Sequence, residues 1–396
     1  MFRCRRGFLL ALPLLLAVPF SAEQQGFASV PVAAVKPSRD ADDTAQFLAG
    51  LPGAPASPFA HLETSPAWKE HRQRLDEAWR KSETSMIRGL LDFQKQELDR
   101  APMWNSTVFY PFGGPDALTA TICFPRSPAY VFVGLEPPGT LPSPEQIAKK
   151  DLSNYLRGIR ETMASVLGRS FFITHQMDQQ FRGQVTDGLL LPMVQLLTRR
   201  QYTIVRIRYV RVDDEGHVIE REAGYKSPGK FANNGVEIEF RSPDPGQATQ
   251  KLCYFAVNLS DDRLRDNKAF LAYLSRMRET TTLLKATSYV MHRLDFSIIR
   301  DLVLANSVAI LQDDSGIPYR WFRSGFWNLA LYGAYDHPYG SFRGLVQPDL
   351  RNAYKAAEPK RLSFGIGYGY ARMPSNLLLA KRVNAAPVTQ PRTASP

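Results

Sequence analysis

The feature that most constrains the fold is an alternation of short apolar, β-rich runs with longer segments of helical periodicity. Runs typical of buried strands, rich in Val, Ile, Phe and Tyr, cover residues 107–112, 130–135, 170–174 and 307–311. Helical segments are expected at residues 116–124, 145–167 and 296–305. Strands that alternate with helices favour an α/β arrangement, in which helices flank a sheet.

The middle of the chain has a different pattern, which indicates antiparallel pairing. A long β-rich run at residues 202–212 reaches an Asp-Asp-Glu-Gly turn and returns at residues 217–222, as in a hairpin. Residues 236–240 and 252–258 are a second candidate pair, separated by a loop rich in Pro and Gly. We therefore expect a single α/β (or α+β) domain with a mixed, partly antiparallel sheet flanked by helices.

The N-terminus has the three zones of a signal peptide. Arg3, Arg5 and Arg6 precede an apolar run at residues 7–20, and small residues follow it. This run is shorter than the roughly 20 residues that a membrane span needs. We expect residues 1–22 to be removed, with cleavage after Ala28 as the alternative. The mature protein is then expected to be periplasmic or secreted, with no membrane span.

Composition divides the rest of the chain into three parts. Residues 23–64 are rich in Ala, Pro, Gly, Ser and Asp, which is typical of a flexible leader. Ser65 followed by Pro66 is typical of the start of a helix, and a periodic helix is expected to run to about Leu98. Residues 65–381 contain no repeat or clear linker and are expected to form one globular domain. Residues 382–396 are expected to be a disordered tail.

Charge and cysteine content limit the classes of partner. The net charge of +11 would suit an anionic envelope component or glycan. Because no run of five Lys or Arg occurs, scattered cations that aid solubility are the alternative. Export argues against a nucleic-acid partner. Cys123 and Cys253 lie in apolar runs, which favours two buried thiols, while an oxidising compartment would also permit a disulfide.

Polar residues follow several of the expected strands, and they are the candidate catalytic residues. These residues are Asp116, Glu136, His175 and Asp314. Ligands of open α/β sheets bind beyond the carboxyl ends of the strands, so these side chains meet at one rim if the strands are parallel neighbours. Paired carboxylates can divide the acid and base roles of glycoside hydrolysis. A set of His, Asp and Glu can also bind a metal that activates water. The sequence identifies neither a metal nor a cofactor.

Each candidate also has a structural interpretation. Asp116 follows a proline at an expected helix start, where a carboxylate caps free N–H groups. Asp313 and Asp314 precede Ser-Gly, as in an ordinary turn. Glu136 precedes Pro-Pro-Gly and is harder to explain as a cap, so a surface loop is its alternative. For His175 the alternative is a satisfied histidine in the core or at a helix start.

An aromatic segment at residues 321–342 is the candidate substrate-binding region. Trp321, Trp327 and Tyr335 combine flat rings with nearby hydrogen-bonding groups, which suits the face of a sugar. Because each ring also buries a large area, a layer of the core is the alternative.

Several phrases of the sequence carry a resemblance to a known family. They are YPFGGPD at residues 110–116, VGLEP at residues 133–137, KATS at residues 285–288 followed by His292, and LQDDSGIP at residues 311–318. With these phrases the chain resembles a family of secreted bacterial proteins that has no assigned activity. The resemblance implies export and one structural unit over roughly residues 65–381, and it implies no catalytic residues.

Two classes of function remain open. No G-x-S-x-G, H-E-x-x-H or P-loop motif occurs, so the best-known hydrolase and nucleotide-binding signatures are absent from the sequence. One class is an envelope hydrolase, directed at a glycan in the most specific form of the hypothesis, that uses carboxylates at strand ends. The other is a non-catalytic periplasmic factor that binds or assembles an envelope component.

Overall fold

The computed structural model describes residues 39–99, 103–169, 187–222, 231–370 and 375–383. These ranges all belong to one compact unit, Pro37–Pro396. The expected signal peptide, the strand expected at residues 170–174, His175 and nearly all of the expected tail lie outside the described residues. No helix within these ranges is both long enough and apolar enough to span a membrane.

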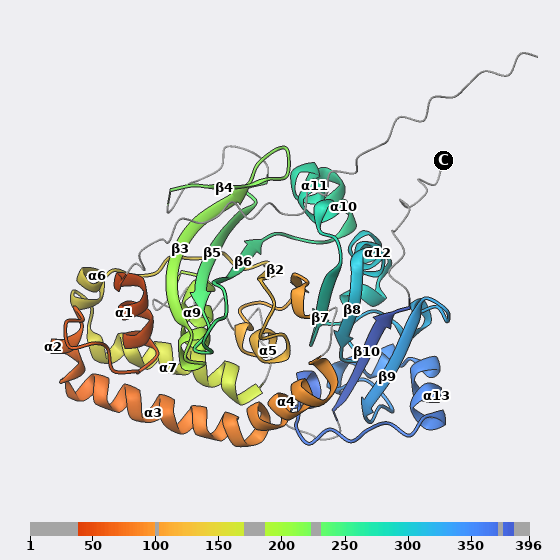
Figure 1. Cartoon of the computed structure of the whole chain (residues 1–396), viewed down its shortest axis with the longest axis horizontal. Helices are drawn as coiled ribbons and strands as arrows, with labels where there is room; N and C mark the ends of the chain where they lie inside the picture. The colour runs from red at the N-terminus through yellow and green to blue at the C-terminus, as the bar shows by residue number, and fades with distance from the viewer. Residues whose placement is uncertain (1–38, 100–102, 170–186, 223–230, 371–374, 384–396) are drawn as a thin grey trace, which may run out of the picture. The chain divides into compact units, whose positions relative to one another are not determined.

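The strands of the described residues form one mixed sheet, in the order β4-β3-β5-β6-β2-β1-β7-β8-β10-β9 (Figure 1). Its five central strands are parallel: β6 (Gln250–Ala256), β2 (Ala129–Gly134), β1 (Val108–Pro111), β7 (Thr280–Leu284) and β8 (Ser307–Gln312). Antiparallel strands extend both edges: β5 (Asn234–Arg241), β3 (Thr203–Val212) and β4 (Val218–Glu220) beyond β6, and β10 (Asn376–Arg382) and β9 (Trp327–Gly333) beyond β8. The predicted α/β fold with a mixed, partly antiparallel sheet is therefore confirmed.

The order of the parallel strands contains one reversal. The chain enters the sheet at β1, moves outward through β2 and β6, and then returns to the other side of β1 with β7 and β8. This is the order 3-2-1-4-5 of doubly wound α/β sheets. The connection after β1 continues to one face of the sheet and the connection after β7 to the other. Doubly wound sheets form a crevice between two such loops.

Each face of the sheet is covered by helices. Successive residues of a strand point to opposite faces, so Tyr110 and Phe132 enter one hydrophobic cluster while Phe109 and Val131 enter the other. Helices of the first face are α1 (Arg39–Leu48), α3 (Pro66–Ser82), α4 (Arg88–Phe93), α5 (Ala117–Cys123), α6 (Pro144–Ala148), α7 (Leu152–Arg169) and α9 (Leu190–Arg199). Those of the second face are α10 (Asp261–Asp266), α11 (Lys268–Arg276), α12 (Ser297–Asn306) and α13 (Pro348–Ala356).

Residues 39–64, expected to be part of a flexible leader, are instead folded. They form α1 and the short helix α2 (Ala60–Glu63). Phe47 and Phe59 are fully buried and stack at 4.4 Å between ring centroids, and the indole N–H of Trp68 donates to the carbonyl of Phe47. The few large apolar residues of this segment cover the start of α3, which its average composition does not reveal.

Two other expectations concern regular structure. The long helix expected after Ser65 is present as α3, the π-helical turn η1 (Glu83–Ile87), α4 and the π-helical turn η2 (Gln94–Leu98). Its expected start is also present, because the Ser65 hydroxyl accepts a hydrogen bond from the N–H of Trp68. Residues 362–366, expected to be a last strand, contain no strand. The last strand of the described residues is instead β10.

Candidate functional site

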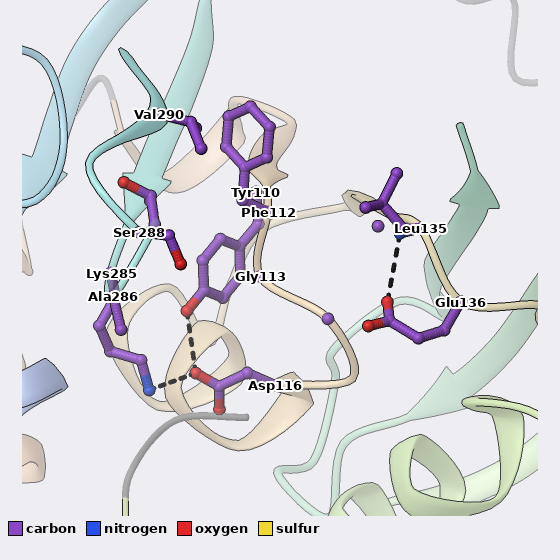
Figure 2. Close-up of a pocket in the computed structure, with 13 residues that line it drawn as sticks. Tyr110, Phe112, Gly113, Asp116, Leu135, Glu136, Lys285, Ala286, Ser288 and Val290 are labelled. Carbon is purple, nitrogen blue, oxygen red and sulfur yellow. Dashed lines mark hydrogen bonds and ion pairs between the residues drawn. The ribbon is translucent and has the colours of Figure 1, made fainter. Parts of the chain in front are cut away.

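A pocket of about 160 Å³ lies at the carboxyl ends of β1, β2 and β7, beside the reversal in strand order. Three loops supply its lining, from residues 110–116, 134–136 and 285–290. Figure 2 shows Leu135 and Glu136 on one side of the pocket and Phe112, Ser288 and Val290 on the other. The position agrees with the rule that doubly wound sheets bind ligands at the switch point.

Asp116 forms the floor of the pocket and is surrounded by donors. Its carboxylate caps α5 by accepting the N–H of Thr119 at 3.1 Å, and it accepts the Tyr110 hydroxyl at 2.9 Å. The ammonium of Lys285, at the end of β7, lies 2.5 Å from the same carboxylate and also donates to the Thr119 hydroxyl. Asp116 is only 4 % exposed, so this ion pair fastens the β1 loop to the β7 loop inside the protein.

The glycine pair after β1 allows this floor to form. A Cβ on Gly113 would lie 2.6 Å from the ring atoms of Tyr110, closer than any side chain can approach. Without a side chain, the loop folds back over the ring of Tyr110. The same turn directs the Tyr110 hydroxyl to Asp116 (Figure 2).

Glu136 forms one wall and has few partners. Its side chain is 9 % exposed and accepts a single hydrogen bond from the described residues, from the N–H of Leu135 at 3.2 Å. Its backbone is held firmly, because Tyr254 donates to the Glu136 carbonyl and the N–H of Leu189 donates to Pro137. A well-anchored residue therefore presents to the pocket a carboxylate whose acceptor capacity the described residues use only in part (Figure 2).

The β7 loop opposite Glu136 has an uncommon backbone. Ala286, Ser288 and Tyr289 have φ values of 50°, 53° and 54°, and Phe112 in the β1 loop has 64°. Four of the seven non-glycine residues with positive φ in the described ranges therefore belong to the two loops that meet at the pocket. Such strain is retained only where the surrounding structure enforces it, and it is concentrated at functional sites.

Asp313 supports the β7 loop from beneath, and it is not a lining residue. It is 3 % exposed and accepts the N–H of Ala286 at 2.8 Å, together with the N–H and hydroxyl of Ser315. Burial, followed by the neighbouring Asp314, raises the pKa of Asp313 to about 7.

Asp314, expected to be catalytic, likewise serves as a tie between loops. Its carboxylate accepts the Tyr289 hydroxyl and the Asn376 amide, and it does not line the pocket. Burial raises its pKa, which the two hydrogen bonds oppose. The sequence placed Asp314 at the correct edge of the sheet, but the β7 loop lies between it and the pocket.

The structure brings two of the four candidate catalytic residues to the pocket, Asp116 and Glu136. His175 lies outside the described residues. Sequence analysis did not single out Lys285 or Tyr110 as site residues. Lys285 belongs to one of the phrases that carry the family resemblance, and this was the signal in the sequence that could have indicated it.

The aromatic segment is separate from the pocket lining. Trp327 and Tyr335 are buried in the hydrophobic cluster of the second face, and Trp321 packs against it. Arg382 lies over Trp327 and Arg300 over Trp321, at 4.6 and 4.3 Å from the ring centroids. Trp327 and Tyr335 therefore belong to a core layer, the structural alternative, whereas Trp321 is half-buried with a cation over its ring.

Metal ligands and cysteines are not part of the pocket. In the described part of the chain, the group with metal-ligand geometry is Asp213, Glu215 and His217, in the turn between β3 and β4. Cys123 and Cys253 are free thiols; Cys123 is buried, as expected, whereas Cys253 is half-buried.

Comparison of the chain with protein-family models, with curated proteins and with solved structures finds no match. The resemblance to a secreted bacterial family therefore stays a prediction. Functional inference rests on the pocket itself.

Proposed function

We propose that the pocket binds one polyhydroxylated ring, such as a pentose or hexose unit, and that this binding is the centre of the protein's function. The observation that carries the proposal is the Glu136 carboxylate, which is buried and accepts only one hydrogen bond from the described residues. Neither Glu136 oxygen is among the buried atoms of the described residues that lack a hydrogen-bond partner, so the second oxygen is open to the solvent of the pocket. Ligand hydroxyls are donors to such an oxygen, and a vicinal pair can reach both oxygens of the carboxylate.

The size of the pocket supports a single ring. Its volume is about 160 Å³. A cavity of about 150 Å³ accommodates benzene, whereas pockets for drug-sized ligands measure roughly 300–1,000 Å³. The enclosed part of the ligand is then one ring, and the rest of a larger ligand would extend beyond the mouth.

The state of Asp116 favours binding over hydrolysis by two carboxylates. Hydrolysis of that kind needs one carboxyl group that exchanges a proton with the substrate and a second that acts as base or nucleophile. Asp116 instead accepts hydrogen bonds from Thr119 and Tyr110 and forms an ion pair with Lys285. We therefore propose a binding role over the glycan hydrolase. With the N-terminal signal-peptide pattern, we place this role in the periplasm or outside the cell.

The proposal is tested by calorimetric titration of the mature protein with a panel of simple sugars, including D-ribose and D-glucose. At least one should bind, and Glu136→Gln should weaken it at least tenfold, about 1.4 kcal/mol, because an acceptor oxygen is lost. Glu145→Gln is the matched control, since Glu145 is exposed on α6 and should leave the affinity unchanged. Binding that is equally strong in the Glu136→Gln protein, or no binding of any sugar, would overturn the proposal.

A further inference from the structure

The mouth of the pocket is apolar, in contrast to its floor and to Glu136. Leu135, which lines the pocket beside Glu136, is 63 % exposed. On the other side, Phe112 and Val290 line the pocket, and the ring of Phe112 meets Phe296 edge to face at 5.9 Å. Leu294, which begins the short helical turn that contains Phe296, is 89 % exposed.

Exposed large apolar residues are informative when they cluster. Within the described ranges there are five, and one of them, Leu135, lines this pocket together with the apolar side chains of Phe112 and Val290. An apolar surface beside a polar cavity is typical of a ligand site that is selective for an amphipathic molecule. The polar ring held by Glu136 would therefore carry an apolar substituent that reaches the mouth.

The charges of the pocket exclude an anionic substituent. Asp116 occupies the N-terminus of α5, where a doubly wound sheet would otherwise receive a phosphate. Glu136 adds a second carboxylate to the lining. Lys285, the cation of the lining, is already paired with Asp116 at 2.5 Å. With Asp116 neutralised by Lys285, a phosphate on the bound ring would face the Glu136 carboxylate, which has no cation partner among the described residues; this favours an uncharged or cationic substituent.

We infer that the ligand is a nucleoside without phosphate, whose ribose hydroxyls bind Glu136 and whose base lies between Phe112 and Leu135. This inference rests on the proposed function. A base is flat, apolar on its faces and attached directly to a pentose, so it extends from the enclosed ring to the mouth. Glu136 lies about 20 residues after the Gly113-Gly114 turn, as the ribose-binding acid of dinucleotide-binding sheets does after its glycine turn, although this turn lacks their G-x-G-x-x-G sequence.

The experiment compares adenosine, D-ribose and adenosine monophosphate by calorimetric titration of the mature protein and two leucine variants. Adenosine should bind at least tenfold more tightly than ribose, and the monophosphate should bind more weakly than adenosine. Leu135→Ala should weaken adenosine several-fold more than it weakens ribose, because the exposed Leu135 side chain would meet the base at the mouth. Leu345→Ala, at an exposed leucine in the segment η7 (Gly340–Leu345), is the matched control and should change neither.

The outcomes separate the two proposals. If ribose binds, Glu136→Gln weakens it and adenosine is no tighter, the proposed function stands and the nucleoside inference fails. Monophosphate that binds more tightly than adenosine, or an adenosine affinity that Leu135→Ala leaves unchanged, also overturns the inference. If neither ribose nor adenosine binds, the inference fails, and the rest of the sugar panel decides the proposed function.

Discussion

Three carboxylates at the same edge of the sheet are buried to a similar degree and differ in how many donors they accept. Asp116 on the pocket floor and Asp313 beneath the β7 loop each accept three. Glu136 on the pocket wall accepts one from the part of the chain that the structure describes. Since buried polar groups in folded proteins are normally hydrogen-bonded, the first two are satisfied by the fold itself.

This difference separates the two carboxylates that connect the loops around the pocket, Asp116 and Asp313, from the carboxylate that we propose binds the ligand, Glu136. Asp116 joins the loops after β1 and β7, and Asp313 joins the loops after β7 and β8. Removing either should release loops and lower stability. Within the described ranges, the Glu136 carboxylate joins no two elements, so its removal should affect ligand binding far more than stability.

The largest effect is expected from breaking the ion pair on the floor. Lys285→Met should lower the free energy of unfolding by about 3–5 kcal/mol, because Asp116 then remains buried without its cation. Urea denaturation followed by circular dichroism measures the change.

A surface ion pair provides the control for that substitution. Lys360 lies 2.5 Å from Glu97, the same separation as in the buried pair, but its side chain is 67 % exposed. Lys360→Met should cost no more than about 1 kcal/mol. Equal losses in the two variants would show that the floor pair is no more important than a surface pair.

Replacement of Gly367, which packs against Asp313, tests whether Asp313 holds the β7 loop in place. A Cβ on this residue would lie 2.2 Å from a carboxylate oxygen of Asp313, at a φ of +58°. Gly367→Ala should lower the free energy of unfolding by about 1–3 kcal/mol, as overpacking does, and should displace the loop that Asp313 holds. The same denaturation experiment measures it.

Gly340→Ala separates this contact from backbone strain. Gly340 has a similar φ of +55°, and a Cβ there would meet no atom within 4 Å. Its replacement reports the conformational effect alone, which should be smaller. If the two variants lose the same stability, the contact between Gly367 and Asp313 is unimportant.

Asp313 should also give stability a dependence on pH. Its pKa is about 7 in the folded protein and near 3.8 ordinarily. Between these values the folded state keeps a proton that the unfolded state has released. The contribution of Asp313 to stability should therefore be largest below pH 4 and fall by up to about 1.4 kcal/mol per pH unit until about pH 7.

This dependence has to be measured as a difference between proteins. Burial lowers the pKa of His71 to about 4, which makes stability rise with pH over part of the same range. Asp313→Asn removes the carboxylate titration and also weakens the loop contacts of Asp313. The second loss should not vary with pH, so the variant should gain stability relative to the wild type as pH rises from 4 to 7. A difference that is constant with pH would contradict the assignment.

Local patterns in the sequence were sufficient to locate several elements and the edge at which the pocket forms. The apolar runs that predicted β1, β2 and β8 are buried strands, and the predicted antiparallel pairs correspond to β3 with β4 and β5 with β6. Asp116 and Glu136 were predicted from their places after two of these strands. Both predictions depend on neighbouring residues in the chain.

Elements whose stability depends on distant partners were not predicted. The threonines of β7 are polar in sequence, yet Thr281 and Thr282 are fully buried because their hydroxyls pair with Ser106 and Ser307. These partners lie far away in the chain, so no local pattern marks β7 as a central strand. For the same reason, the sequence could not predict the β7 loop. Nor could it predict that this loop separates Asp116, which lines the pocket, from Asp314, which does not.

The smallest effect on stability is expected from Glu136→Gln, and this substitution completes the comparison. Glutamine keeps the shape of the side chain, and its amide oxygen can still accept the N–H of Leu135. Because no cation or hydroxyl of the described residues depends on the carboxylate, the free energy of unfolding should change by less than about 0.5 kcal/mol. Urea denaturation at neutral pH measures it, beside Asp116→Asn, which should lose about 1–3 kcal/mol. A loss at Glu136 as large as that at Asp116 would mean that Glu136 is also a structural tie, and the unused acceptor that supports the proposed function would not exist.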